Sequence, residues 1–303
     1  MISNWAKGSS LVLFGAFLWG TLVVFTKGAA HLEPTTVAVV RGALSTGACF
    51  LWLGITKPHI LKIESRMFFP LFFCGLPAAC MYMGFTIALK TLSVATCEII
   101  FFTFPLFTTV LGIFILKERP TALQVVACFL ILAGVVCMTV LPEGHSEGDT
   151  PPSVVGFIGA TLSMSGMTAQ SLIGRRNAQK NWLSTETLFA YTQLFAFFWM
   201  VPYKALTAGW GDLPDILPAS WLLMAYMGII ATFLAYGAYN LGLRYIHAST
   251  ASMLASFEMV TAVTLAAAAL GTWPTAGELV GCIVILTALV LSSQSARKQS
   301  ACS

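Results

Sequence analysis

The sequence predicts an all-α membrane protein in which ten transmembrane helices form two inverted five-helix repeats around a central cavity. Hydrophobic residues make up 57% of the chain, and charged residues only 9%. The apolar residues fall in successive windows of about 20, the length of helix that spans a bilayer core. The two halves of the chain also match each other in sequence. Together these observations favour a membrane protein built by duplication.

The apolar windows follow one another along the chain with short connections between them. We expect helices at 9–28, 35–55, 67–89, 95–116, 121–141, 154–173, 184–203, 219–242, 249–270 and 277–294. The first window is as long as a full span and lacks a small-residue cleavage pattern, so we expect it to remain as a helix. The chain then divides into a first five-helix repeat (1–141), an outer acidic linker (142–153), and a second five-helix repeat with a short cytoplasmic tail (154–303).

The internal match covers residues 82–136. Slid forward without a gap, this segment aligns Tyr82 with Tyr236, Leu89 with Leu243, Lys90 with Arg244, Thr96 with Thr250, Pro120 with Pro274, Thr121 with Thr275 and Cys128 with Cys282. Five spans per half is an odd number, so the second copy must lie upside down relative to the first. Inverted repeats of this kind are typical of secondary transporters, whose substrate site lies between the halves near the middle of the bilayer.

The same register predicts where two helices begin. Thr121 with Gln124, and Thr275 with Glu278, each form the T-x-x-E/Q pattern of a capping box. In this arrangement the two side chains satisfy free backbone N–H groups reciprocally. A structural role is sufficient for these residues, so we expect no functional role for Glu278.

Basic residues predict the orientation of the chain, because cytoplasmic loops carry an excess of Lys and Arg. With the N-terminus in the cytoplasm, only Lys27, Lys90 and Lys204 fall on the outer side. The inner side then receives Lys7, Lys57, Lys62, Arg66, Lys117, Arg119, Arg175, Arg176, Lys180, Arg244, Arg297 and Lys298. We expect both termini to be cytoplasmic and the protein to lie in a bacterial inner membrane. This bias explains the net charge of +4 without a nucleic-acid partner.

Several motifs resemble the EamA-type drug/metabolite transporter superfamily over nearly the whole chain. They are Phe17-Leu18-Trp19-Gly20, Arg41 early in the second span, Tyr82 followed by Ala88-Leu89-Lys90, Thr103-Phe104-Pro105-Leu106, and Lys117-Glu118-Arg119-Pro120. The resemblance implies ten helices, with spans one to four and six to nine around a central cavity and spans five and ten at the periphery. It also implies transport, of amino acids, nucleotide sugars, drugs or other metabolites.

The chain departs from that superfamily in the ninth span. It carries Glu258-Met259 where such proteins often have Glu-Pro. We therefore expect the second half to lack the helix break that Pro105 gives the first half.

Three ionisable residues fall inside apolar windows, where a charge is costly unless it faces a partner or water. Arg41 and Glu98 share a depth within roughly 5–10 Å by helical rise, and we expect them to pair in the outer part of the cavity. The alternative is that Glu98 lies in interfacial water while Arg41 snorkels. Glu258 lies near mid-span. It either faces the cavity, to carry a proton or bind a substrate ammonium, or stays protonated and bonds a neighbouring helix.

Further candidates for the substrate site lie at cavity depth. Tyr82 and Tyr236 are favoured because the repeat matches them, although most aromatic residues in such a chain only pack. The remaining candidates are Trp19, Tyr191 and Asn240, which lies one turn after Tyr236 on the same face. Pro105 removes a backbone donor within its span, which allows either a kink used for gating or packing without motion.

The chemistry of these residues favours a small zwitterion or cation as the substrate. Arg41 suits a carboxylate, Glu98 or Glu258 an ammonium, and the aromatic rings a cationic or apolar part. We therefore expect a secondary transporter that exports an amino acid or a related metabolite by alternating access, with proton coupling as one option. A nucleotide sugar or a quaternary amine is the alternative substrate class. A channel or an intramembrane enzyme is a distant alternative.

No motif in the sequence predicts catalysis or a cofactor. The chain lacks H-E-x-x-H, G-x-S-x-G and Walker A patterns, and its four histidines are scattered through expected loops. We expect no enzyme activity, no cofactor, and neither catalytic nor metal-binding residues. The expected partners are the small-molecule substrate and the lipid bilayer, and the expected state is a monomer or a homodimer.

Overall fold

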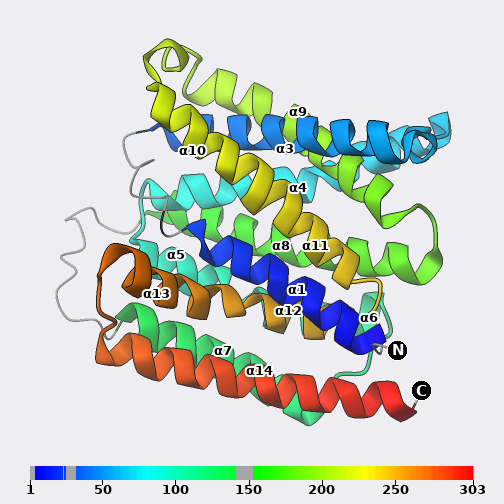
Figure 1. Ribbon diagram of the computed structural model, residues 1–303, viewed down its shortest axis with the longest axis vertical. Coiled ribbons are helices and arrows are strands. Elements are labelled where there is room, and N and C mark those ends of the chain that lie inside the picture. The colour runs from blue at the N-terminus through cyan, green and yellow to red at the C-terminus, as the bar shows by residue number, and fades with distance from the viewer. Residues whose placement is uncertain (1–3, 23, 25–31, 141–152, 303) are drawn as a thin grey trace.

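The computed structural model describes residues 4–22, 24, 32–140 and 153–302, and these residues form helices and no strand. The helices lie side by side in one bundle (Figure 1). The start of α1 (Asn4–Gly20) and the end of α14 (Ala276–Cys302) lie at the same end of the bundle. We call this the terminal end and the opposite one the far end. The predicted acidic linker, apart from Ser153, and the end of the first predicted span lie outside the described residues.

The elements follow the predicted apolar windows. The first half forms α1, α3 (Pro34–Thr56), α4 (Phe68–Leu89), α5 (Val94–Phe101), α6 (Phe104–Ile115) and α7 (Ala122–Val140), with 3₁₀ turns at Pro58–Leu61 and Ser65–Met67. The second half forms α8 (Val154–Lys180), α9 (Thr185–Thr207), a 3₁₀ turn (Leu213–Asp215), α10 (Pro218–Gly228), α11 (Ala235–Gly242), α12 (Ala248–Ala255), α13 (Phe257–Leu270) and α14. A π-helical segment, Ile229–Leu234, joins α10 to α11.

Seven helical segments in the described part of the chain are long and apolar enough to cross a membrane. They are Pro34–Thr56, Ser65–Leu89, Val94–Ile115, Ala122–Val140, Pro218–Gly242, Ala248–Ala269 and Ala276–Arg297. The chain is therefore a multi-pass integral membrane protein, as predicted. The number of ten spans and the inverted repeat remain predictions.

Both predicted capping boxes are confirmed. The backbone N–H of Thr121 donates to Gln124 Oε1 (2.9 Å), and the N–H of Gln124 donates to Thr121 Oγ1 (3.3 Å). Thr275 and Glu278 form the same pair of bonds at 2.7 and 3.2 Å. Each pair satisfies two donors that the first turn of α7 or α14 leaves free.

Glycines allow the helices to approach closely. A Cβ at Gly84 in α4 would lie 2.5 Å from the carbonyl oxygen of Gly159 in α8, and one at Gly281 in α14 would lie 2.6 Å from that of Gly134 in α7. Lipid provides no hydrophobic force between helices, so close backbone packing of this kind holds membrane bundles together. The pairs α4 with α8 and α7 with α14 are accordingly packed along their lengths.

The expectation of an unbroken ninth span is wrong. Helix α12 ends at Ala255 and α13 begins at Phe257, just as α5 ends at Phe101 and α6 begins at Phe104. At the second break, the N–H of Ser256 donates to the carbonyl of Met253 (3.0 Å), which is a 3₁₀-type bond. Such a bond tightens the last turn of a helix and ends it without a proline.

Candidate functional site

An aromatic cluster occupies the centre of the bundle. The ring of Trp19 (α1) lies 4.5 Å from that of Tyr236 and 5.6 Å from that of Tyr239 (α11). Tyr82 (α4) meets Tyr236 edge-on at 6.1 Å. All four residues are at most 8% exposed. The structure thus brings together Trp19, Tyr82 and Tyr236 from both halves of the chain.

Two polar atoms of this cluster are deeply buried. Nε1 of Trp19 has no hydrogen-bond partner among the described residues, and the hydroxyl of Tyr82 lies near the side chain of Gln193 without a well-formed hydrogen bond. By contrast, the hydroxyl of Tyr239 is 2.7 Å from Ser171 Oγ in α8. Buried polar atoms are nearly always hydrogen-bonded, and the few exceptions often lie where water or a ligand binds. A polar ligand or water bound beside Trp19 would satisfy its Nε1.

Arg41 lies beside the aromatic cluster. Its guanidinium carbon is 5.4 Å from the centre of the Tyr82 ring, and its Nε donates to the hydroxyl of Thr232. Thr232 belongs to the π-helical segment and donates to the carbonyl of Met227 at 2.7 Å. Gly228 lets this helix approach α3, since a Cβ there would lie 3.0 Å from the Arg41 carbonyl oxygen. π-helical segments often mark functional sites.

The two intramembrane glutamates share this neighbourhood. Glu98 (α5) and Glu258 (α13) are both half-buried, and neither carboxylate forms a hydrogen bond or ion pair with a described residue. Glu258 lies within the electrostatic reach of Glu98 and Arg41, and Tyr236 within that of Arg41 and Glu258. The predicted direct pair of Arg41 with Glu98 is absent among the described ion pairs, because Arg41 bonds Thr232 instead.

Charged side chains join the two halves of the chain at the terminal end. There α6 packs against α8 and α12 (Figure 1). Glu118, which follows α6, pairs with Arg175 of α8 at 2.8 Å and accepts the N–H of Ala248 at the start of α12 at 3.0 Å. Arg175 also donates to the carbonyl of Leu243 (3.0 Å). Both charged side chains are at most 14% exposed. Glu118 thus holds the first half of the chain against two helices of the second.

The far end is arranged differently. Helices α5 and α13 continue α6 and α12 toward it, yet these two form no packed pair among the described helices. Since α6 and α12 are packed together, the two broken spans diverge from the terminal end toward the far end. The unpartnered carboxylates of Glu98 and Glu258 lie on these diverging segments.

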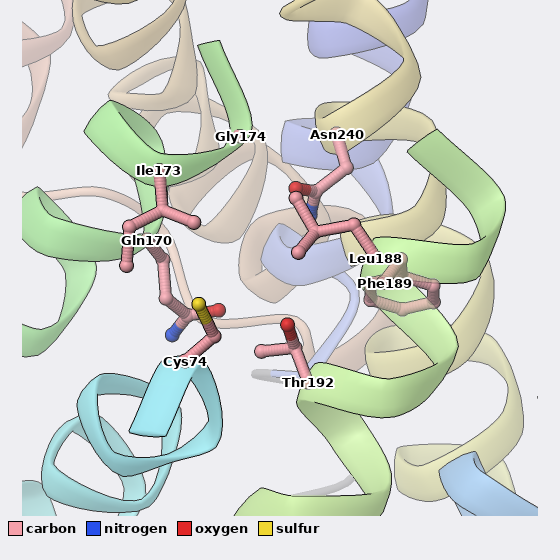
Figure 2. Close-up of a pocket in the computed structure, with 8 residues that line it drawn as sticks. All are labelled: Cys74, Gln170, Ile173, Gly174, Leu188, Phe189, Thr192 and Asn240. Carbon is pink, nitrogen blue, oxygen red and sulfur yellow. The ribbon is translucent and has the colours of Figure 1, made fainter. Parts of the chain in front are cut away.

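A small pocket lies between α4, α8, α9 and α11 on the terminal side of the aromatic cluster (Figure 2). Figure 2 shows Asn240, Gln170, Thr192 and Cys74 around it. Its volume of about 10 Å³ is what one water molecule needs. Asn240 donates to the carbonyl of Tyr236 (2.8 Å), so it lies one helical turn after Tyr236 on α11. A metabolite is too large for a pocket of this volume.

Tyr191 and Pro105 lie outside the central cluster. The hydroxyl of Tyr191 donates to the carbonyl of Leu61 (2.7 Å), and its ring packs edge-on against Phe50. Tyr191 therefore anchors a connection at the terminal end in this structure. Pro105 occupies the first turn of α6, where the missing N–H breaks no helical bond.

These features together define a multi-pass membrane transporter with a polar, aromatic-lined centre. The sequence pattern of the EamA-like transporter family matches residues 6–140 and again residues 152–294. The chain belongs to this family, which confirms the resemblance to EamA-type drug/metabolite transporters. The family and the relatives below are transporters and not enzymes.

Two relatives come from Bacillus subtilis (strain 168), and both are described as uncharacterized transporters. YwfM is 26% identical over 299 residues, covering 96% of this chain and 95% of YwfM. YyaM is 27% identical over 296 residues, covering 93% of this chain and 92% of YyaM. One crystal structure shares the fold, with a TM-score of 0.83 at 18% identity, over 97% of this chain and 99% of the other.

Proposed function

We propose that this protein is a secondary transporter that exports a small zwitterionic or cationic metabolite, such as an amino acid, by alternating access. The gathering of Arg41, Glu98 and Glu258 around one aromatic cluster carries the proposal. Charges inside a bundle are costly and mark substrate or ion pathways. The family and its relatives support transport, and the site chemistry supports the substrate class.

The residues divide the recognition of such a substrate between them. Arg41 binds the carboxylate through its planar guanidinium, and Glu98 or Glu258 binds the ammonium. Trp19 and Tyr236 cover the cationic or apolar part. Arg41 is the basic residue whose charge acts on both Glu258 and Tyr236. A nucleotide sugar, which carries several phosphate charges, therefore fits less well, and a quaternary amine would leave Arg41 unused.

We infer that the chain forms ten spans in two inverted repeats. The family pattern matches the chain twice, once in each half. Helix contacts also occur in pairs that the repeat relates. In the repeat α4 corresponds to α11 and α8 corresponds to α1, and α4 packs on α8 as α11 packs on α1. When the two halves are aligned by the repeat, the helix break before Phe104 falls close to the helix break before Phe257. The excess of basic residues at the terminal end supports a cytoplasmic location for both termini, in the inner membrane of a bacterial cell.

With that orientation, the contacts of Glu118 and Arg175 support a state in which the cytoplasmic side is closed. The terminal end, held by Glu118 and Arg175, is then the proposed cytoplasmic gate. Export requires the reverse state, in which the Glu118 contacts break and the small pocket at Asn240 widens. Exchange of a proton on Glu98 or Glu258 would couple the two states to the proton gradient.

The substrate class can be tested with the purified protein in liposomes. We expect accumulation of a radiolabelled amino acid against its gradient, which a channel cannot produce. Arg41→Gln should reduce transport of amino acids at least tenfold, while the corresponding amines without a carboxylate keep most of theirs, because only the carboxylate contact is lost. Lys90→Gln, a change in an exposed pair at the far end, is the control. Equal losses for both substrate types in Arg41→Gln would refute carboxylate binding.

The proposed gate predicts a change in thiol exposure. Glu118→Gln weakens a charge-assisted contact of about 1.5–3 kcal/mol, so the open-gate population should rise about tenfold or more. Cys74, which lines the small pocket, should then react faster with a maleimide reagent in a variant without the other cysteines.

The matched control for the gate is Glu186→Gln. It removes the Lys57–Glu186 pair (2.9 Å) between α3 and α9, which pack together along their lengths. The labelling rate of Cys74 should stay unchanged in this variant. Equal rates in Glu118→Gln and the unmodified protein would exclude Glu118 from the gate.

A further inference from the structure

A groove of about 320 Å³ runs along the outer surface between α6 and α8. One wall is the stripe Phe107, Leu111 and Ile115 of α6, whose side chains are 38–44% exposed. Ser165 and Leu172 of α8 form part of the other wall. In a membrane-spanning bundle an exposed apolar groove at this depth faces the lipid. The groove spans about 12 Å from Phe107 to Ile115 by helical rise, most of the thickness of one leaflet.

A cation closes the terminal end of this groove. Arg176 lines it and is exposed. Its guanidinium lies 5.8 Å from the ring of Trp182, and it forms no ion pair with a described residue. Its neighbour Arg175 does not line the groove and is paired with Glu118 at 2.8 Å. Trp182 is 58% exposed, as a residue at the headgroup level would be.

We propose that this groove binds one anionic phospholipid, with an acyl chain between α6 and α8 and the headgroup phosphate on Arg176. The apolar length of the groove suits a chain, and the unpaired guanidinium suits a phosphate, which arginine binds in bidentate fashion. Trp182 holds the guanidinium at headgroup level by a cation–π contact. Basic pockets between transmembrane helices on the cytoplasmic side bind anionic headgroups in this manner.

The site has a mechanical consequence. Helix α6 carries the gate residue Glu118 at its end, and α8 carries Arg175. A lipid wedged between these helices stabilises the spacing seen with the gate closed. The site is independent of the central cluster, since none of its lining residues belongs to that cluster.

Native mass spectrometry of the purified full chain tests the site. The protein is exposed to equal amounts of phosphatidylglycerol and phosphatidylcholine with the same acyl chains. We expect one phosphatidylglycerol to be retained in preference to phosphatidylcholine, and this preference to fall about fivefold in Arg176→Gln. Arg176→Lys should keep most of it. Ser165→Trp, which fills the groove from the lipid side, should reduce retention of both lipids.

Lys180→Gln is the matched control, because Lys180 lies one turn further along α8 and does not line the groove. Gel filtration and helical content show whether each variant is folded. The proposal is wrong if Arg176→Gln retains phosphatidylglycerol like the unmodified protein, or if Lys180→Gln loses it to the same degree. It is also wrong if both lipids are retained equally, or if Ser165→Trp retains both unchanged. None of these readouts depends on transport.

Discussion

Glu258→Gln should leave the transporter folded but remove the pH dependence of its transport. Glu258 is half-buried as a residue, and its carboxylate forms no hydrogen bond or ion pair with a described residue and lies near Glu98 and Arg41. A carboxylate inside the bundle that has no bonded partner is a candidate for carrying a proton along the transport pathway. Glutamine mimics the protonated form and cannot exchange a proton. We expect a loss of proton-driven accumulation of at least tenfold.

Transport measured against pH in liposomes decides this prediction. Glu98→Gln is the comparison, because it removes the second carboxylate and leaves Glu258 in place. A structural Glu258 gives the opposite pattern. In that case Glu258→Gln transports normally at every pH, while Glu258→Ala is destabilised because a neighbouring group loses its partner.

Asp212→Asn should lower the free energy of unfolding by about 3–5 kcal/mol, because it leaves a buried ammonium without its counter-charge. Lys204 of α9 is fully buried, with Nζ 2.5 Å from Thr36 Oγ1 and 3.1 Å from Asp212 Oδ1. Thr36 also bonds Asp212, and the Trp210 ring lies 5.1 Å from Lys204 Nζ. These contacts tie α3, α9 and the connection after α9 together at the far end.

The same contacts predict a pH dependence. Partial burial acts to raise the pKa of Asp212, but hydrogen bonds from Thr36 and Lys204 hold this pKa below its usual value. The stabilisation is therefore complete above about pH 4, the pKa range of an unfolded Asp, and is lost as the pH falls through the lower folded value. At neutral pH the full effect of Asp212→Asn should appear.

Thermal unfolding in detergent measures the effect. The control is Arg66→Gln, since the Arg66–Glu64 pair is 78% and 67% exposed and should contribute less than about 1 kcal/mol. A double change, Lys204→Met with Asp212→Asn, should recover part of the loss because no unpaired charge remains. If Asp212→Asn unfolded at a thermal midpoint as high as that of Arg66→Gln, the proposed stabilising role of the Lys204–Asp212 pair would be ruled out.

The sequence alone determined the class of the protein and the local structure of its helices. A run of about 20 apolar residues is a local property of the sequence, and its helical length matches the bilayer core. The membrane spans could therefore be predicted. The capping boxes at Thr121 and Thr275 were predictable because their partners lie three residues away. Arg41, Glu98 and Glu258 were identifiable as site candidates because a charge inside an apolar run is costly unless it faces a partner or water.

Only the tertiary structure decided which groups these residues meet. Arg41 bonds Thr232, and Glu118 bonds Arg175, across separations of 191 and 57 residues that no local pattern encodes. Lys204 was predicted only as a basic residue on the outer side, and its complete burial follows from packing among α3, α9 and the following connection. Tyr191 sat at a plausible depth but faces a connection at the terminal end. Depth along a helix follows from counting residues, whereas the direction a side chain faces depends on how each helix is rotated against its neighbours.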